Sequence, residues 1–369
     1  MRVLIVSKAL VSAMYRNKLT ALAALGMDVT AVVPKSWREG GGEQRLEPGP
    51  ADGFELIESA LRWNGHFHVH YYPELPAVIR RIRPDLLYMD EEPFNLATLL
   101  GVRAAARRGI PSLFFTWQNL FRRYPLPGRL VEQQVYRTVS WALAGTADAA
   151  GVLRAKGFGK GITVAPQFGV DPDVFSPGGP APRPFTIGFF NRLIPAKAPM
   201  QTLLAFAGLP DDARLCFVGD GPLREELMAE ARENGLAQRL SFSARVPSGC
   251  LPGLIRGVHV IVLPSLTTPR WKEQFGRILV EAMACGVPVI GSDSGEIPRV
   301  IGDAGLIVPE GDVVALRSAL LRLYEDAELR ARLGEEGRRR VLERFSNDRV
   351  AALTHEACSA AVGVFTQMT

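Results

Sequence analysis

Two glutamates eight residues apart, Glu273 and Glu281, have a spacing that suggests chemistry. The intervening Phe275–Gly276 turn and apolar run predict a helix from Gly276 to Cys285, whose first amides are unpaired and attract a phosphate or diphosphate. Helical rise then separates the two carboxylates by about 12 Å. The carboxyl pair of a glycoside hydrolase lies at about 5–9.5 Å. The spacing therefore suits two ends of one extended ligand.

Two basic residues, Arg192 and Lys197, lie five apart in the turn that follows an expected strand at 185–190. An arginine supplies a bidentate fork and a lysine a mobile point charge, so the two can converge on one diphosphate. Loops between strands and helices often carry basic residues, so this pair alone is a weak signal.

Glycines at the start of a second expected helix have two interpretations. In Val218-Gly-Asp-Gly-Pro222 they let a ligand approach the backbone closely. A tight turn with proline at the helix start explains the same residues.

The segment 264–298 closely resembles the signature of the family 4 retaining glycosyltransferases, in which the two glutamates bind a nucleotide-sugar. The resemblance implies that Glu281 accepts hydrogen bonds from ribose hydroxyls and that Glu273 meets the transferred sugar. It also implies that Arg192 and Lys197 neutralise the leaving nucleoside diphosphate. The catalytic residues implied are Glu273, Arg192 and Lys197, and the donor-binding residues are Gly219, Gly221, Arg245, Val246, Gln274, Phe275, Gly276 and Glu281.

The sequence departs from the family pattern at four places. Ala198 and Gln274 stand where glycine is usual, and Ser7–Ala13 replaces a glycine pair after the first strand. The run 115–120, where many members have a histidine near the reacting carbon, has none. We therefore expect a mechanism without a protein base, in which the departing diphosphate accepts the acceptor's proton.

The first half should hold the acceptor. Glu91 and Glu92 follow an expected strand and either orient an acceptor hydroxyl or form a solvated acidic loop. Lys18 is expected with three other residues at a basic edge of the same cleft. The acceptor-side residues are Lys8, Tyr15, Arg16, Glu91, Glu92, Gln118 and Asn119.

Three histidines alternate at His66, His68 and His70, which would place them on one face of an extended strand. Such a face can bind a metal, but no carboxylate or cysteine partner is obvious nearby. We favour a half-exposed strand or an acceptor-facing loop, and expect no metal site.

Apolar runs alternate with amphipathic helical stretches along the whole chain, which is typical of parallel α/β domains. Expected strands are 3–6, 29–33, 86–89, 112–116, 162–165, 185–190, 215–218, 240–242, 258–263 and 287–290. Expected helices are 15–25, 75–82, 96–108, 129–143, 199–206, 222–234, 276–285, 315–324, 328–344 and 348–365. Glu39–Gly53 is expected to be a mobile surface loop.

Residues 171–184 hold five prolines and predict an interdomain linker. The expected domains are 1–178, which binds the acceptor, and 185–349, which binds the nucleotide-sugar. The resemblance implies the GT-B α/β fold, in which two Rossmann-like domains with parallel sheets face a deep cleft. It also implies that the helix 350–369 crosses back to the first domain.

Size and charge limit the class of protein. The chain has 369 residues, 47% of them hydrophobic, and no apolar run near the roughly 20 residues that span a bilayer. Residues 1–178 hold 21 Lys and Arg against 16 Asp and Glu, and the remainder holds 22 of each. This excess is compatible with an anionic acceptor, with a peripheral membrane contact, or with a solvated surface.

The four cysteines are scattered without metal-ligand spacing, as expected for free thiols in a reducing cytoplasm. We therefore expect a cytoplasmic protein, with the inner membrane face as the place of any peripheral contact. No motif for nucleic-acid binding is present.

We expect a retaining, metal-independent hexosyltransferase of polysaccharide, glycolipid or other glycoconjugate biosynthesis. It would need no cofactor, a UDP- or GDP-sugar as co-substrate, and a glycan, lipid-linked sugar or small molecule as hydroxyl acceptor. The missing histidine and glycine pair favour an alternative, a catalytically weak or inactive GT-B scaffold that binds the nucleotide-sugar and supports a partner transferase.

Overall fold

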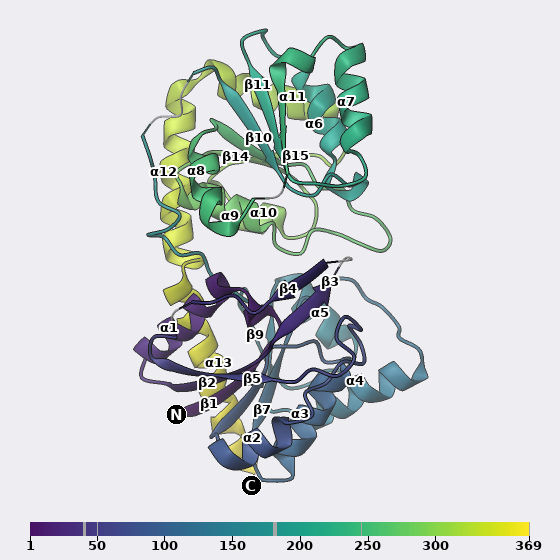
Figure 1. The fold of residues 1–369 in the computed structure, drawn as a ribbon, viewed down its shortest axis with the longest axis vertical. Coiled ribbons are helices and arrows are strands. Elements are labelled where there is room, and N and C mark those ends of the chain that lie inside the picture. Colours follow the sequence, from purple (N-terminus) through teal and green to yellow (C-terminus); the bar gives the residue numbers. More distant parts are fainter. Residues whose placement is uncertain (40–41, 50, 180–182, 245, 369) are drawn as a thin grey trace. The chain divides into compact units, whose positions relative to one another are not determined.

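The structure is a computed structural model that describes residues 1–39, 42–49, 51–179, 183–244 and 246–368. The chain divides into two compact units, Met1–Gly169 with Asn347–Thr369 and Val170–Ser346 (Figure 1). Each unit is built on a parallel sheet covered by helices. The prediction of two Rossmann-like α/β domains is therefore confirmed.

The first unit contains a seven-stranded sheet in the order β5-β2-β1-β6-β7-β8-β9, with every neighbouring pair parallel. Its central strands are near-continuous apolar runs, because helices bury both faces of a parallel sheet. The strands are β1 Arg2–Val6, β2 Asp28–Pro34, β5 Phe54–Ser59, β6 Leu86–Met89, β7 Ser112–Thr116, β8 Trp141–Ala144 and β9 Gly161–Val164.

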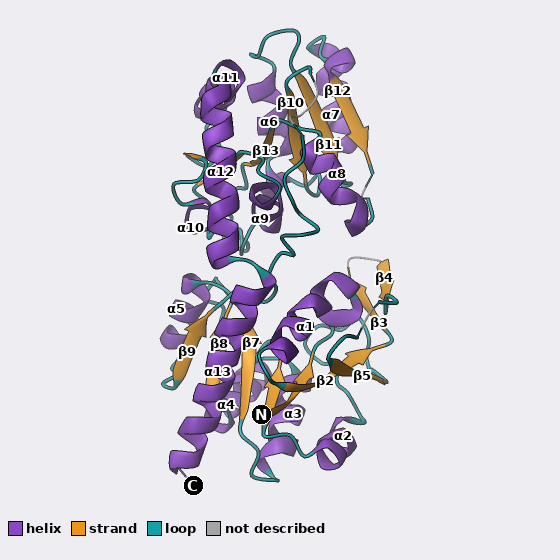
Figure 2. Cartoon of the chain, turned by 90° about the vertical axis from the view of Figure 1, so that its left-hand side faces the viewer, coloured by secondary structure: helices purple, strands orange, loops and turns teal. Residues whose placement is uncertain are grey.

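Six α-helices cover this sheet in the described residues. Figure 2 shows α13 lying across β7, β8 and β9, and the same helix packs against α1. The helices are α1 Asn17–Ala24, α2 Leu75–Ile82, α3 Leu96–Ala106, α4 Leu126–Thr138, α5 Ala147–Ala155 and α13 Asn347–Met368. The C-terminal helix thus belongs to the first unit.

The second unit contains a six-stranded parallel sheet in the order β12-β11-β10-β13-β14-β15. Its strands are β10 Thr186–Phe190, β11 Arg214–Val218, β12 Leu240–Ser243, β13 Val260–Leu263, β14 Val289–Ser292 and β15 Leu306–Val308. Its α-helices are α6 Pro199–Phe206, α7 Arg224–Glu233, α8 Leu251–Arg256, α9 Arg277–Ala284, α10 Ile297–Ile301, α11 Val313–Glu325 and α12 Ala327–Arg344.

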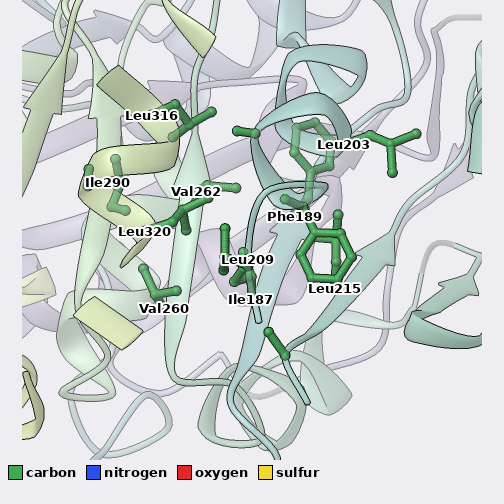
Figure 3. Packing of buried hydrophobic residues seen from close by; sticks show 14 of the residues in the cluster. Ile187, Phe189, Leu203, Leu209, Leu215, Val260, Val262, Ile290, Leu316 and Leu320 are labelled. Carbon is green, nitrogen blue, oxygen red and sulfur yellow. The ribbon is translucent and has the colours of Figure 1, made fainter. Parts of the chain in front are cut away.

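One buried cluster joins this sheet to its helices (Figure 3). Phe189 and Val262 on neighbouring strands contribute to it, together with Leu203 of α6 and Leu320 of α11. This packing holds the strand ends, and therefore the loops that follow them, in fixed positions.

Several local predictions differ from the structure. The helix expected over 129–143 ends at Thr138, and residues 141–144 instead form β8, since their backbone pairs with both β7 and β9. Part of the expected loop Glu39–Gly53 is a strand, β4 Gly42–Arg45, which pairs antiparallel with β3 Ser36–Glu39. Residues 40, 41 and 50 lie outside the described residues.

The division between the units also differs from the expected boundaries. It falls at Gly169/Val170, because Val170 pairs with Ser346 and Arg338 donates hydrogen bonds to the carbonyls of Pro172 and Phe175. Residues 170–178 therefore pack with the second unit. The final helix begins at Asn347 and packs with the first.

Candidate functional site

Two loops meet at the carboxyl edge of the second sheet, where the strand order changes direction between β10 and β13. A ligand crevice in an α/β sheet lies at such a point. The loop after β10 contains Lys197 and the loop after β13 contains Glu273. The Leu266 amide donates to the Ala196 carbonyl at 2.9 Å and joins the two loops.

Lys197 and Glu273 form a buried ion pair. The Lys197 ammonium contacts Oε2 of Glu273, and the Ser265 hydroxyl donates to the same oxygen at 2.7 Å. Both charged residues are only 6% exposed. The structure thus brings together two of the three catalytic residues that the resemblance implied, and adds Ser265.

Trp271 completes this cluster. The Lys197 Nζ lies 4.6 Å from the centroid of its indole ring, which is a favourable cation–π distance. A backbone bridge joins Trp271 to Thr268, and the neighbouring Thr267 hydroxyl donates to Glu310 at 2.5 Å. Sequence reasoning missed Trp271, although a tryptophan two residues before the first glutamate is a visible signal.

Burial lowers the pKa of Lys197, and the Arg192 charge lowers it further, although Glu273 opposes the shift. The ammonium has therefore lost much of its hydration, and additional negative charge beside it would be favourable. Arg192 itself is exposed, and its guanidinium makes no hydrogen bond or ion pair with any described residue.

Glu281 lies on α9 and has a cation of its own. The Arg277 Nε donates to Glu281 Oε1 at 2.8 Å, while Oε2 has no hydrogen-bond donor within the described ranges. Burial raises the pKa of Glu281, although Arg277 opposes this shift. A donor from a ligand would satisfy the remaining oxygen.

The start of α9 requires two glycines. Gly276, the N-cap, has a φ of +76°, and a Cβ there would lie 2.8 Å from Leu263 Cδ2. Gly295 has a φ of +54°, and a Cβ there would collide with the Glu273 carbonyl oxygen. Gln274 is exposed, and the Phe275 ring packs edge-on against Phe345 at 5.7 Å.

The glycines after β11 serve close backbone packing. A Cβ on Gly219 would collide with the Asn191 carbonyl, and one on Gly221 with the Leu193 carbonyl. These glycines therefore help to position the loop that carries Arg192, and their contact with a nucleotide stays a prediction. Val246 is half-buried; Arg245 lies outside the described residues.

Ala198 has a φ of +55° and lies at the N-cap of α6. Glycine adopts this left-handed conformation without steric cost. The family's usual glycine would adopt this backbone conformation without strain, whereas the Cβ of Ala198 makes it less favourable.

The carboxyl edge of the first sheet holds a second buried charge cluster between β1 and β6. The Lys8 ammonium pairs with Glu91, which also accepts hydrogen bonds from Tyr72 and Asn95, each at 3.3 Å. Burial would raise the pKa of Glu91, but Lys8 and His70 outweigh it and lower the pKa to about 2. Glu91 and Lys8 therefore neutralise each other's charge, and Glu91 is not part of a solvated acidic loop.

Glu92 differs from its neighbour. Burial raises its pKa to about 7, although the Thr116 hydroxyl and the Trp117 amide donate to its two oxygens at 2.5 and 2.8 Å. The residue as a whole is partly exposed. Of the two glutamates, Glu92 is the one that a ligand hydroxyl can approach.

Two residues of the expected basic edge are buried. Arg16 and Lys18 are both 3% exposed, and each donates to a backbone carbonyl, of Glu47 and Gln167 respectively. Tyr15 stacks on Phe168 with ring centroids 4.3 Å apart. These side chains hold α1 and its neighbours in place, because burial leaves their polar atoms only protein partners.

Gln118 and Asn119 are buried beside β7. Lys156 donates to Gln118 Oε1 at 2.8 Å and to Glu132 at 2.6 Å, and Gln118 donates to the Tyr124 hydroxyl at 3.3 Å. Sequence reasoning missed the Lys156–Glu132 pair, because its members lie on different helices.

The three histidines do not lie on one strand. Residues 62–71 form a series of turns closed by a bridge between Arg62 and Tyr71, and His70 is buried while His66 and His68 are exposed. The expected strand is therefore wrong, since turns at residues 63–69 replace the extended backbone. Nowhere in the described ranges do three or more His, Cys, Asp or Glu side chains gather as a potential metal site.

Fold and site together define a class of protein. Two Rossmann-like units, one carrying a buried Lys–Glu pair beside a helix N-terminus, are the components of the GT-B architecture. Two solved structures share this fold over nearly their whole length. Sucrose-phosphate synthase from Thermosynechococcus elongatus has a TM-score of 0.72 and 19% identity, covering 96% of this chain and 98% of that chain. Anabaena Alr3699/HepE in complex with UDP has a TM-score of 0.73 and 18% identity, covering 98% and 100%.

Two family models then identify the family. Residues 11–166 match the glycosyl transferase 4-like domain and residues 172–340 match glycosyl transferases group 1. The chain belongs to the family 4 glycosyltransferases. The N-acetyl-alpha-D-glucosaminyl L-malate synthase of Bacillus anthracis is 34% identical over 143 residues, which are 38% of this chain and 36% of that protein. The chain thus spans only about a third of that relative's length.

No helix among the residues that the structure describes is long and apolar enough to cross a membrane.

Proposed function

We propose that this protein is a retaining, metal-independent glycosyltransferase that moves a hexose from a nucleoside-diphosphate sugar, UDP or GDP, to an acceptor hydroxyl. The observation that carries the proposal is the buried cluster of Lys197, Glu273 and Ser265 at the carboxyl edge of the second sheet. Family membership and the UDP complex of the structural relative support the choice of ligand.

Arg192, Lys197 and the amides at the start of α9 would hold the diphosphate. Lys197 is poorly hydrated, and the Arg192 guanidinium has no hydrogen bond or ion pair with a described residue, so both gain from an added anion. The α9 N-cap is a glycine without a side-chain cap, and the N-terminus of a helix favours an anion. Stabilising the charge that develops on the leaving group would be the main catalytic effect.

Glu273 would contact the transferred sugar through its carboxylate, which Lys197 and Ser265 hold in position. Glu281 would bind the ribose, since its Oε2 lacks a donor among the described residues. Each glutamate has its own cation, so the two do not form the carboxylate pair of a double displacement. This supports retention through a step in which the departing diphosphate accepts the acceptor's proton.

The acceptor hydroxyl would bind at the carboxyl edge of the first sheet. Glu92 is partly exposed and has a pKa of about 7, so it can orient a hydroxyl there. Gln118 would help to shape this site, in which no histidine follows β7. A glycan, a lipid-linked sugar or a small molecule of glycoconjugate biosynthesis would be the acceptor, and a peripheral membrane contact of the first unit would suit a lipid-linked one.

The first test measures thermal shifts with UDP, GDP, ADP, dTDP and CMP on the wild type and on Arg192→Ala. A ligand at 100 times its dissociation constant stabilises by about 2.7 kcal/mol. Loss of a charge-assisted contact of about 1.5–3 kcal/mol should weaken binding roughly 10- to 100-fold. Arg192 is exposed, so this variant should keep the fold.

The matched control is Arg232→Ala, which removes an exposed arginine from α7. It should bind like the wild type. One diphosphate that shifts the wild type and the control equally, and Arg192→Ala clearly less, supports the site; no shift with any of the five would refute it. Binding without transfer or donor hydrolysis in a cell extract would favour the alternative, a nucleotide-sugar-binding scaffold.

A further inference from the structure

A cavity of 790 Å³ opens at the opposite edge of the second unit's sheet, where β13 and β14 begin. Its walls include His259 before β13, Pro288 before β14, Cys285 at the end of α9, and one side of α12. Helix α12 packs against α9, and α9 contacts α8. Lys197 and Glu273 are not among the lining residues. The cavity is therefore separate from the site at the carboxyl edge.

The wall formed by α12 is closely packed. A Cβ on Gly334 would collide with the Gly286 carbonyl, and one on Gly337 would lie 3.0 Å from Met283 Cγ. These contacts bring α12 against α9, so the cavity is not the result of a loosely attached helix. Its volume lies in the range of about 300–1,000 Å³ that is usual for small-molecule sites.

The lining is strongly basic. It contains one acidic residue, Glu335, and five arginines, none of which forms an ion pair with a described carboxylate. The arginines are Arg183, Arg256, Arg330, Arg338 and Arg339.

Three of these arginines are held by backbone carbonyls. Arg338 donates to Phe175 and Ala284 at 2.7 and 2.8 Å, Arg256 to Ser176 at 3.2 Å, and Arg330 to Tyr324 at 3.1 Å. A carbonyl fixes the direction of a guanidinium but does not remove its full charge. Their positions are thus set before any ligand arrives.

His259 lies in the lining of this cavity, so its pKa depends on the charges there. The Thr186 amide donates to its Nδ1 at 3.1 Å, so the neutral ring carries its proton on Nε2. Burial lowers the pKa of His259, and Arg330 and Arg183 lower it further. An anion bound beside these arginines would oppose that effect.

We propose that the arginine-lined cavity binds a phosphorylated ligand, whose phosphate pairs with Arg330 and Arg183 while its apolar part lies against Val258 and Val287. Guanidinium groups match phosphate oxygens in bidentate geometry and are the usual choice for phosphate recognition. The apolar residues of the lining would contact the remainder of the ligand. This site is distinct from the proposed diphosphate site at the carboxyl edge.

The test follows the five histidines by NMR, with His259→Gln to assign the signal. Pyrophosphate and, separately, phosphatidic acid vesicles are titrated into the full chain. We expect a saturable rise of about one unit in the pKa of His259 with at least one probe. A response to pyrophosphate assigns a soluble ligand, and a response to vesicles alone assigns a lipid headgroup.

Arg183→Gln tests the arginines without a folding cost, because Arg183 is exposed and its side chain makes no hydrogen bond with a described residue. It should weaken the response about tenfold, whereas Arg332→Gln, on α12 but outside the lining, should not. Arg192→Ala should leave the response intact, which separates this site from the first. No saturable His259 response to either probe, or an equal response in Arg183→Gln, would overturn the proposal.

Discussion

Removing the charge of Glu273 should destabilise the second unit in a pH-dependent way. In Glu273→Gln the Lys197 ammonium stays buried without its carboxylate, and breaking such a pair costs about 3–5 kcal/mol. For a unit of this size that is about 6–20 °C in Tm. Lys197→Met with Glu273→Gln removes both charges, and should cost less than the two single substitutions together.

The sign of the pH dependence follows from Lys197. Burial already lowers its pKa below that of the unfolded chain, and loss of Glu273 lowers it further. Between the two pKa values the unfolded state binds more protons, so the stability of Glu273→Gln should rise with pH as the folded pKa is passed and level off above 10.5. The wild type should show a smaller rise in this range.

The assay is urea unfolding by circular dichroism at pH 7 and pH 9, with hydrogen exchange on peptides from β13 and α9 to isolate the second unit. Equal stability of Glu273→Gln and the wild type at pH 7 would refute the buried pair. So would a double variant whose cost equals the sum of the two single costs, since that would show that the two residues do not interact.

Three further outcomes are expected. Trp271→Leu removes a cation–π contact of about 0.5–2 kcal/mol and should lower kcat/KM for the donor about 2- to 30-fold, while Trp271→Phe should retain most of it. Gly295→Ala forces the Glu273 backbone to move and should cost about 2–3 kcal/mol in thermal unfolding and about 100-fold in transfer rate, whereas Gly253→Ala, with open space at its Cβ, should not. Glu91 has a folded pKa of about 2 against 4.5, so it contributes about 3 kcal/mol that is present above pH 4.5 and lost as pH falls toward 2. Glu91→Gln should flatten urea midpoints over this range, and an unchanged slope would contradict the assignment.

Much of the fold was predictable because its signals are local. Leu86–Met89 and Ser112–Thr116 were predicted with the bounds that the structure has, since buried parallel strands are short apolar runs between turn residues. The helix over Leu75–Ile82 was likewise correct, because its apolar residues recur at helical spacing. Residues 141–143 of the strand Trp141–Ala144 were assigned to a helix, because four residues are too few for periodicity to distinguish a strand from a helix.

The sequence predicted which residues belong to the candidate site better than it predicted which of them contact each other. Glu273 and Lys197 were selected from motifs around each residue, and the structure places them together. Arg16 and Lys18 were expected at a basic edge of the acceptor cleft, and both are buried and donate to backbone carbonyls. Residue type indicates that a cation is present, whereas only the surrounding packing decides whether water reaches it.

The sequence by itself determined the alternation of strands and helices, the family motif around Glu273 and Glu281, and therefore the α/β class. Those features depend on residues within a few positions of one another. The tertiary structure alone decided that Lys197, 76 residues away, neutralises Glu273, that Trp271 covers Lys197, and that five arginines surround one cavity. Such contacts depend on which strands are neighbours in the sheet, and strand order is set by the packing of the whole unit and not by any local segment.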